Sequence, residues 1–301
     1  MSAPWLLIDA GNSRIKWALA PGRKPAGWRA AQPAFLASGA VAHAQWRSLA
    51  GDIRAQWPAP DTRLAPPLGA TPGLPIGQPD RPGGIACPAP AGVWVSNVAG
   101  EAADQAVRVT LQTLWGVGPP APLNVLRSTA AAGGIVNRYA DPSQLGTDRW
   151  ASLIGAHAAF PGEHLLIVTL GTATTVEALT SAGEFLGGVI APGPALMLSS
   201  LAQGTAQLPN VTADTPALAT GFAVNTHDAL ISGCLGAQAG LVERCHASLQ
   251  RDLGGAVRCV LAGGARRLLA PMLSIPFTEH DHLVLAGLYE IAVHPATGGD
   301  R

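Results

Sequence analysis

Cysteine, charge and long apolar runs are all scarce in this sequence. Only four of its 301 residues are cysteine and none stands in a C-x-x-C spacing, so neither a zinc site nor a disulfide framework is indicated. We expect buried free thiols at Cys87, Cys234, Cys245 and Cys259. Charged residues make up 13% of the chain, and Lys plus Arg (19) equals Asp plus Glu (19), so no nucleic-acid partner is expected.

Segments that would direct the chain to a membrane are also missing. Asp9 interrupts the only early apolar run, no basic stretch precedes it, and no unbroken apolar run reaches about 18 residues. We therefore predict a cytoplasmic protein without a membrane partner. The pattern G-x-x-x-x-G-K-[ST] is absent, which disfavours a P-loop nucleotide site. His280 and His282 flank Asp281 without a metal-ligand pattern, and we interpret them as the entry to a helix.

Proline and glycine, in contrast, are abundant and crowd into one segment. The chain has 26 Pro and 36 Gly, and residues of about 58–92 are dense in both. Because Pro removes backbone donors and Gly costs chain entropy, this segment is expected to be a loop or insertion. On either side of it, apolar strands alternate with helical patterns, which indicates an α/β fold. We predict an N-terminal lobe over 1–160 that carries the insertion, and a C-terminal lobe over 161–301.

The N-terminal lobe is expected to begin with a three-stranded meander. Its strands are predicted at residues 5–9, 14–20 and 27–31, followed by a helix over 34–56. The turn between the first two strands reads D-A-G-N-S and is followed by Lys16. Such a turn reverses the chain in any hairpin. It also gathers an acid, a flexible backbone, an amide, a hydroxyl and a cation, which suit a phosphate and its metal ion.

The same pattern returns at residue 164. Residues 164–179 again form an apolar strand, a turn rich in Gly and hydroxyls at 171–172, and a second apolar strand, and a third strand is expected at 184–191. Two lobes that each begin with such a hairpin predict a cleft in which two turns grip one polyphosphate from opposite sides.

Several motifs then resemble a known family. The segments D-A-G-N-S (9–13) and G-T-A-T-T (171–175) are similar to the actin–Hsp70–sugar-kinase superfamily. The segment Y-A-D-P-S-Q-L-G-T-D-R (139–149) resembles the Y-x-x-P-x-x-L-G-x-D-R signature of type III pantothenate kinases, also called the Baf family. Residues 187–193, 205–209 and 260–264 add further matches. The resemblance covers nearly the whole chain outside residues of about 58–92.

The resemblance implies a fold, an activity and an ATP site. The fold would be two similar ribonuclease-H-like lobes, as in the actin-like ATPases, with ATP in the cleft between them. The activity would be ATP-dependent phosphorylation of pantothenate, the first step of coenzyme A biosynthesis. Asp9 would hold Mg²⁺ directly or through water. The residues implied at ATP are Asp9, Ala10, Gly11, Asn12, Ser13, Arg14, Ile15, Lys16 and Thr172.

The resemblance also implies a site for the acceptor. Asp148 would take the proton of the acceptor hydroxyl, and Arg149 would hold a carboxylate or amide oxygen of pantothenate. Thr226, from the partner subunit of a homodimer, would complete the pocket. The pocket residues implied in this way are Tyr139, Gly146, Thr147, Asp148, Arg149 and Thr226. Without the resemblance, a structural ion pair would be the preferred interpretation of Asp148-Arg149, and Thr226 could be a helix cap.

One position departs from the family pattern. The family usually has Asp at the first position of D-x-G-T-A, where it binds K⁺ or NH₄⁺, and this chain has Thr169. A neutral oxygen attracts a cation less, although Glu177 is near in sequence. Two other functions stay open: a kinase for another small hydroxyl acid, or an accessory or regulatory protein that keeps the fold without the activity. The full set Asp9, Lys16, Asp148, Arg149 and Thr172 favours an active kinase.

Overall fold

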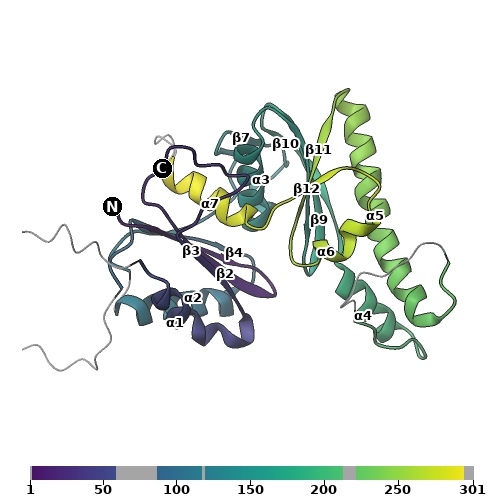
Figure 1. The fold of residues 1–301 in the computed structure, drawn as a ribbon, viewed down its shortest axis with the longest axis horizontal. Helices are drawn as coiled ribbons and strands as arrows, with labels where there is room; N and C mark the ends of the chain where they lie inside the picture. The colour runs from purple at the N-terminus through teal and green to yellow at the C-terminus, as the bar shows by residue number, and fades with distance from the viewer. Residues whose placement is uncertain (1, 59–86, 117–118, 213–221, 295–301) are drawn as a thin grey trace, which may run out of the picture.

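The computed structural model describes residues 2–58, 87–116, 119–212 and 222–294. It shows two β-sheets, each with helices on its outer face, and two helices between them (Figure 1). Most of the Pro/Gly-rich segment predicted at about 58–92 lies outside the described residues. No helix within the described ranges is long and apolar enough to cross a membrane.

The first sheet has five strands in the order β3-β2-β1-β4-β5. Their bounds are β1 Trp5–Ala10, β2 Arg14–Ala20, β3 Ala37–Ala42, β4 Gly92–Asn97 and β5 Leu123–Val125. β1 is buried on both faces, because Leu6 and Ile8 pack in one core cluster while Leu7 belongs to another. The outer cluster is closed by helices η1 (His43–Ser48), α1 (Leu49–Ala55) and α2 (Glu101–Trp115).

The second sheet has seven strands in the order β12-β11-β8-β9-β10-β7-β6. Their bounds are β6 Ala131–Ala132, β7 Ile135–Asn137, β8 His164–Leu170, β9 Ala173–Leu179, β10 Glu184–Pro192, β11 Val257–Ala262 and β12 Phe277–Glu279. The elements beside it are η3 (Pro142–Gln144), α4 (Pro194–Gly204), α5 (Thr226–Leu253), α6 (Arg266–Leu269) and η4 (Ala270–Met272). In both sheets an antiparallel three-strand meander is followed by parallel strands, so the repeat predicted from the sequence is a structural one.

Helices α3 (Thr147–Ala159) and α7 (Leu283–Val293) pack together between the two sheets (Figure 1). Glycine makes their close approach possible. A Cβ on Gly287 would lie 1.9 Å from the carbonyl oxygen of Ala151, and one on Gly155 would lie 2.3 Å from that of Leu283. The pair carries the first turn of α3 to the ends of β1 and β4. Because β6 and β7 join the second sheet and α7 packs on the first, the two lobes exchange elements, and the boundary near residue 160 stays a prediction.

Two expected elements of the N-terminal lobe are wrong. The third strand lies at Ala37–Ala42, not at 27–31, and the helix expected over 34–56 is confined to residues from 43 onward. Residues 21–36 instead cross to α7, where Tyr289 donates to the carbonyl of Pro21 (2.9 Å) and its ring lies 4.7 Å from that of Trp28. The composition of β3, A-S-G-A-V-A, favours no strand. The segment becomes a strand through its packing on β2, where Gly39 lies opposite Trp17. A Cβ on Gly39 would lie 2.8 Å from the indole of Trp17, so this position has no room for a side chain.

Candidate active site

The two hairpin turns predicted to grip a polyphosphate face each other directly. The first is closed by a hydrogen bond from the Gly11 amide to the Arg14 carbonyl (3.2 Å), the second by one from the Gly171 amide to the Ala173 carbonyl (2.9 Å). The hydroxyl oxygens of Ser13 and Thr172 lie 2.8 Å apart although 159 residues separate them in sequence. The turns of the two sheets therefore meet across the cleft.

The first turn exposes some of its predicted ATP residues and buries others. Asn12, Ser13 and Arg14 are exposed and Lys16 is half-buried, so their side chains can reach a ligand in the cleft. Ala10 and Ile15 are completely buried in the core of the first sheet. Only the backbone of these two residues can face a nucleotide.

The second turn is supported by close backbone packing. The amide of Gly193, just before α4, donates to the carbonyl of Thr172 (2.9 Å), and a Cβ on Gly193 would lie 2.2 Å from the carbonyl oxygen of Gly171. Gly263, after β11, has a φ of +90°, and a Cβ there would lie 2.2 Å from the carbonyl oxygen of Leu170. The turns after β8, β10 and β11 thus converge closely, because glycine at positions 193 and 263 lets their backbones approach.

Asp9, at the end of β1, is the buried acid of the first wall. It is 5% exposed, and its Oδ1 accepts no hydrogen bond from any residue that the structure describes. Burial raises its pKa to about 6; Lys16, opposite it on β2, opposes this rise, and Asp148 adds to it. Mg²⁺ prefers carboxylate oxygens, commonly one or two together with phosphates and water. An unpartnered carboxylate beside the phosphate turn fits that ion.

Asp148 lies in the first turn of α3, near the end of β4, the strand that pairs with β1 beside Asp9. Ser96 of β4 pairs with Asp9 in the sheet, and its hydroxyl lies 3.0 Å from that of Thr147. The Asp148 Oδ1 accepts from the Arg149 amide (2.7 Å), and a Cβ on Gly146 would lie 2.8 Å from the same oxygen. Burial raises the pKa of Asp148, while that hydrogen bond and the nearby cations lower it. A carboxylate with a raised pKa is suited to accept a proton.

Arg149 does not form its ion pair with Asp148. It is 9% exposed, and its Nε donates to Oε1 of Glu177 (2.7 Å), an acid on β9 that is 1% exposed. Its Nη1 donates to the hydroxyl of Tyr139 (3.1 Å), and its Nη2 has no partner among the described residues. The guanidinium therefore joins α3 to the second sheet and to one predicted pocket residue.

Thr226 lies away from this cluster. It is the exposed first residue of α5 and lines an apolar groove with residues of α4. Helices α4 and α5 lie on the far side of the second sheet from α3 (Figure 1). The helix cap is Asn225, whose Oδ1 accepts from the Asp228 amide (2.9 Å), so a capping role for Thr226 is wrong. Within one chain, Thr226 does not reach the acceptor pocket.

His43 lies beside the first turn, and no sequence motif predicted it there. Its Nε2 lies 2.6 Å from the carbonyl oxygen of Gly11, in the first turn. The residue follows β3, which the sequence analysis placed inside a helix, and no motif contains it. A hydrogen bond to this carbonyl holds the turn in one orientation.

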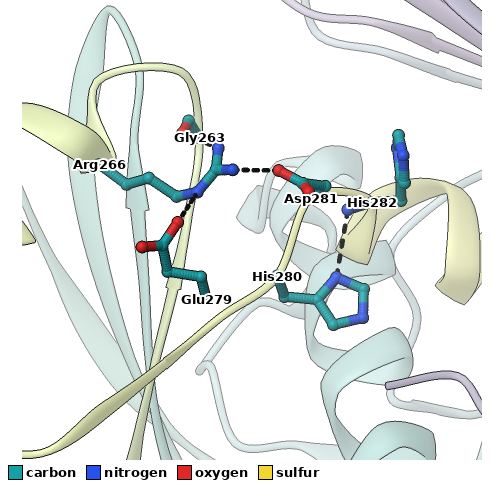
Figure 2. A network of polar contacts seen from close by, with 6 residues as sticks. All are labelled: Gly263, Arg266, Glu279, His280, Asp281 and His282. Atoms are coloured by element: carbon teal, nitrogen blue, oxygen red, sulfur yellow. Dashed lines mark hydrogen bonds and ion pairs between the residues drawn. The ribbon is translucent and has the colours of Figure 1, made fainter. Parts of the chain in front are cut away.

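His280 and His282 mark the entry to α7, as predicted (Figure 2). The amide of His282 donates to Nδ1 of His280 (3.1 Å), so the other nitrogen of His280 donates to the carbonyl of Ala30 (2.7 Å). Arg266 binds Glu279 and Asp281 and donates to the carbonyl of Gly263 (3.0 Å). This network ties the turn after β11 to the segment that enters α7. No group of three or more His, Cys, Asp or Glu side chains in the described part of the chain could hold a metal ion.

Comparison with known proteins now places the chain. The sequence model of the type III pantothenate kinases matches residues 81–248. A type III pantothenate kinase of Burkholderia thailandensis is 46% identical over 97% of this chain and 99% of that protein. One from Burkholderia pseudomallei is 44% identical over 97% and 99%. The chain belongs to the type III pantothenate kinase family. The predicted family and enzyme class, an ATP-dependent kinase that phosphorylates pantothenate in coenzyme A biosynthesis, are thereby confirmed.

Solved structures agree on the fold. A Baf family protein from Campylobacter jejuni superposes with a TM-score of 0.50 at 17% identity, covering 96% of this chain and 98% of its own. A protein from Sinorhizobium meliloti described as a 2-dehydro-3-deoxygalactonokinase gives 0.50 at 15% identity, with the same coverage. The predicted actin-like ATPase and sugar-kinase fold is confirmed.

Proposed function

We propose that this kinase transfers the terminal phosphoryl group of ATP to a hydroxyl of pantothenate in the cleft between its two hairpin turns. The observation that carries the proposal is the contact between Ser13 and Thr172, 2.8 Å apart, with the buried acid Asp9 and the half-buried acid Asp148 beside the first turn. Phosphoryl transfer depends mainly on positioning and on charge stabilisation. The two facing turns supply the positioning, and the charged groups beside the first turn supply the charge stabilisation.

ATP is proposed to lie with its phosphates between the turns. The side chains of Asn12 and Ser13 and the Thr172 hydroxyl would donate to phosphate oxygens, and Gly11 and Gly171, without side chains, would let the phosphates approach the two turns. Lys16 would add a positive charge. Asp9 would hold Mg²⁺, whose positive charge would offset the negative charge of the phosphates.

Asp148 is proposed as the base that takes the proton of the acceptor hydroxyl. Its raised pKa and its place in the first turn of α3 support this role. Arg149 would orient the acceptor, because its unpartnered Nη2 can donate to a carboxylate or amide oxygen. Tyr139, Gly146 and Thr147 shape the walls around these two residues.

The protein is proposed to work as a homodimer in the cytoplasm. Large apolar side chains are exposed around the groove that holds Thr226, among them Phe222 (105%), Val224 (98%) and Leu196 (46%). Such a patch is a common mark of a protein interface. Covering it with a second copy would bring Thr226 to the partner's acceptor pocket. Four free cysteines suit a reducing compartment.

A monovalent cation is proposed to matter less here than in relatives. Thr169, at the end of β8, brings a neutral oxygen where the family has Asp. Glu177 is committed to Arg149 and is no spare ligand. We expect activity with K⁺ or NH₄⁺ required at higher concentration or not at all.

The decisive experiment assays the purified protein for ADP release with a panel of hydroxyl acceptors. Pantothenate is expected to give the highest kcat/KM. A different preferred acceptor would support the alternative of a kinase for another hydroxyl acid, and no turnover with any acceptor would support an accessory protein.

A mixing experiment tests the shared site. An Asp148→Asn chain and a Thr226→Ala chain, each of low activity, are combined under conditions in which subunit exchange is demonstrated. Mixed dimers contain one intact site, so partial activity should return. Absence of rescue after exchange would contradict a pocket shared between subunits.

A further inference from the structure

Arg149 is held by a surround that no motif predicts. Glu177 accepts from its Nε on one side, and Gly188 lies on the neighbouring strand directly opposite Glu177 in the β9–β10 pairing. A Cβ on Gly188 would lie 2.8 Å from Nη2. The second sheet thus provides a buried carboxylate for Nε and, on the next strand, a glycine that leaves room for Nη2.

The third support comes from Tyr139. Its hydroxyl accepts from Nη1 (3.1 Å), and its ring lies 5.2 Å from that of Phe185 on β10. Nε and Nη1 are therefore engaged by the protein, and Nη2 is the guanidinium nitrogen left without a partner in the described structure. A donor that is buried and unpaired carries a free-energy cost unless a ligand satisfies it.

We propose that Glu177 is a positioning residue of the acceptor site, which holds Arg149 so that Nη2 is left to bind an anionic or carbonyl oxygen of the acceptor. The inference rests on the proposed role of Arg149. A buried ion pair is weak support for stability, because desolvation of both charges offsets their attraction. Its value here is orientation: a binding group must be held by a supporting shell to within a fraction of an ångström.

The test begins with Glu177→Gln, which keeps the shape and removes the charge. We expect KM for pantothenate to rise on the order of 10- to 100-fold, with KM for ATP changed less than about twofold. Glu184→Gln is the matched control, because Glu184 is an exposed acid of β10 that also pairs with an arginine, Arg138. This control should leave both KM values unchanged.

The variant leaves a buried charge unpaired, so its folding needs a separate check. Urea unfolding defines conditions in which each variant is fully folded, and all kinetics are measured there. Glu177→Asp keeps the charge on a shorter side chain and should give an intermediate KM for pantothenate. Should the Gln variant not fold, the Asp variant carries the test alone, and a wild-type KM in it would overturn the proposal.

The double variant Arg149→Gln/Glu177→Gln distinguishes positioning from other roles. Positioning predicts that Glu177→Gln adds nothing to the raised KM of Arg149→Gln, although the neutral pair regains stability. Multiplied effects would show that Glu177 acts on the acceptor independently, and an unchanged KM in folded Glu177→Gln would show a structural role alone. Either outcome overturns the proposal, whereas a wild-type protein inactive on pantothenate would overturn the proposed function instead.

Discussion

The two walls of the cleft have the same backbone plan and opposite chemistry. On the first wall Asp9 pairs across its hairpin with Lys16, and on the second the corresponding pair is Thr169 with Thr175. One wall therefore carries charges of both signs, and the other carries hydroxyls. In the proposed mechanism the first wall would hold the metal ion, while the second would offer neutral donors to the phosphates.

The charged wall also contains a buried group that lowers the stability of the folded protein. Asp9 is buried without a hydrogen bond to Oδ1, and burial raises its pKa to about 6. The second wall keeps its buried acid, Glu177, paired with Arg149. Strain of this kind is common where a ligand will later satisfy the group.

The largest effect is expected from removing the proposed proton acceptor, Asp148, which lies on α3 beside the charged wall. Asp148→Asn keeps the shape of the side chain but cannot take the proton, so kcat should fall about 10²–10⁴-fold. KM for ATP should change little, since the turns stay intact. Steady-state rates with both substrates varied measure this, and near-full turnover in the Asn variant would rule out Asp148 as the base.

Asp9→Asn should separate activity from stability. We expect kcat/KM to fall on the order of 10²-fold, because the proposed metal ligand loses its charge. The folded protein without nucleotide should become more stable by about 3 kcal/mol at pH 7, because the pKa of Asp9 rises from 3.8 to about 6 on folding.

The pH dependence gives the sign of this effect. Below about pH 4, Asp9 is protonated in both the folded and the unfolded protein, and it does not lower the free energy of unfolding. Between about pH 4 and 6 only the unfolded chain releases the proton, so the free energy of unfolding falls as the pH rises. Above about pH 6 the loss of stability is constant. Urea unfolding of wild type and Asp9→Asn across this range should therefore diverge between pH 4 and 6. Asp252→Asn, at an exposed position of α5, should show no such divergence.

Sequence reasoning succeeded where the signal is local. The strand that ends at Asp9 and the strand after Ser13 were predicted almost to the residue, because apolar runs and turn residues are contiguous there. The prediction of β3 failed, because its composition carries no strand signal and the segment is held as a strand by its pairing with β2, where Gly39 lies opposite Trp17. The Arg149–Glu177 pair joins residues 28 positions apart and the His43 contact joins residues 32 apart, and neither separation is a motif.

The two turns also differ in what holds them, and His43 tests this. The carbonyl of Gly11 accepts from a side chain, whereas the carbonyl of Thr172 accepts from the backbone amide of Gly193. His43→Ala should raise KM for ATP about 2- to 10-fold, the loss expected for one hydrogen bond, and leave KM for pantothenate unchanged. His43→Gln, which can still donate, should recover part of the affinity. Equal changes in both KM values would indicate a general loss of structure.

The smallest expected effect comes from placing an acid at position 169 of the second wall, where the family usually has Asp. Thr169 is half-buried at the end of β8, beside Ala262 of β11. Thr169→Asp would add a carboxylate there, and electrostatic attraction for a monovalent cation should increase. Wild type should show weak dependence of its initial rate on K⁺ or NH₄⁺ in a sodium-free organic buffer. The Asp variant should reach half-maximal rate at a lower cation concentration, with a maximal rate within a few-fold of wild type.

Thr169→Asn adds an oxygen of similar placement without charge, so it should behave as wild type if charge is the cause. A tight, absolute K⁺ requirement in wild type that Thr169→Asp leaves unaltered would show that backbone oxygens alone bind the cation, and that the missing acid does not distinguish the two walls.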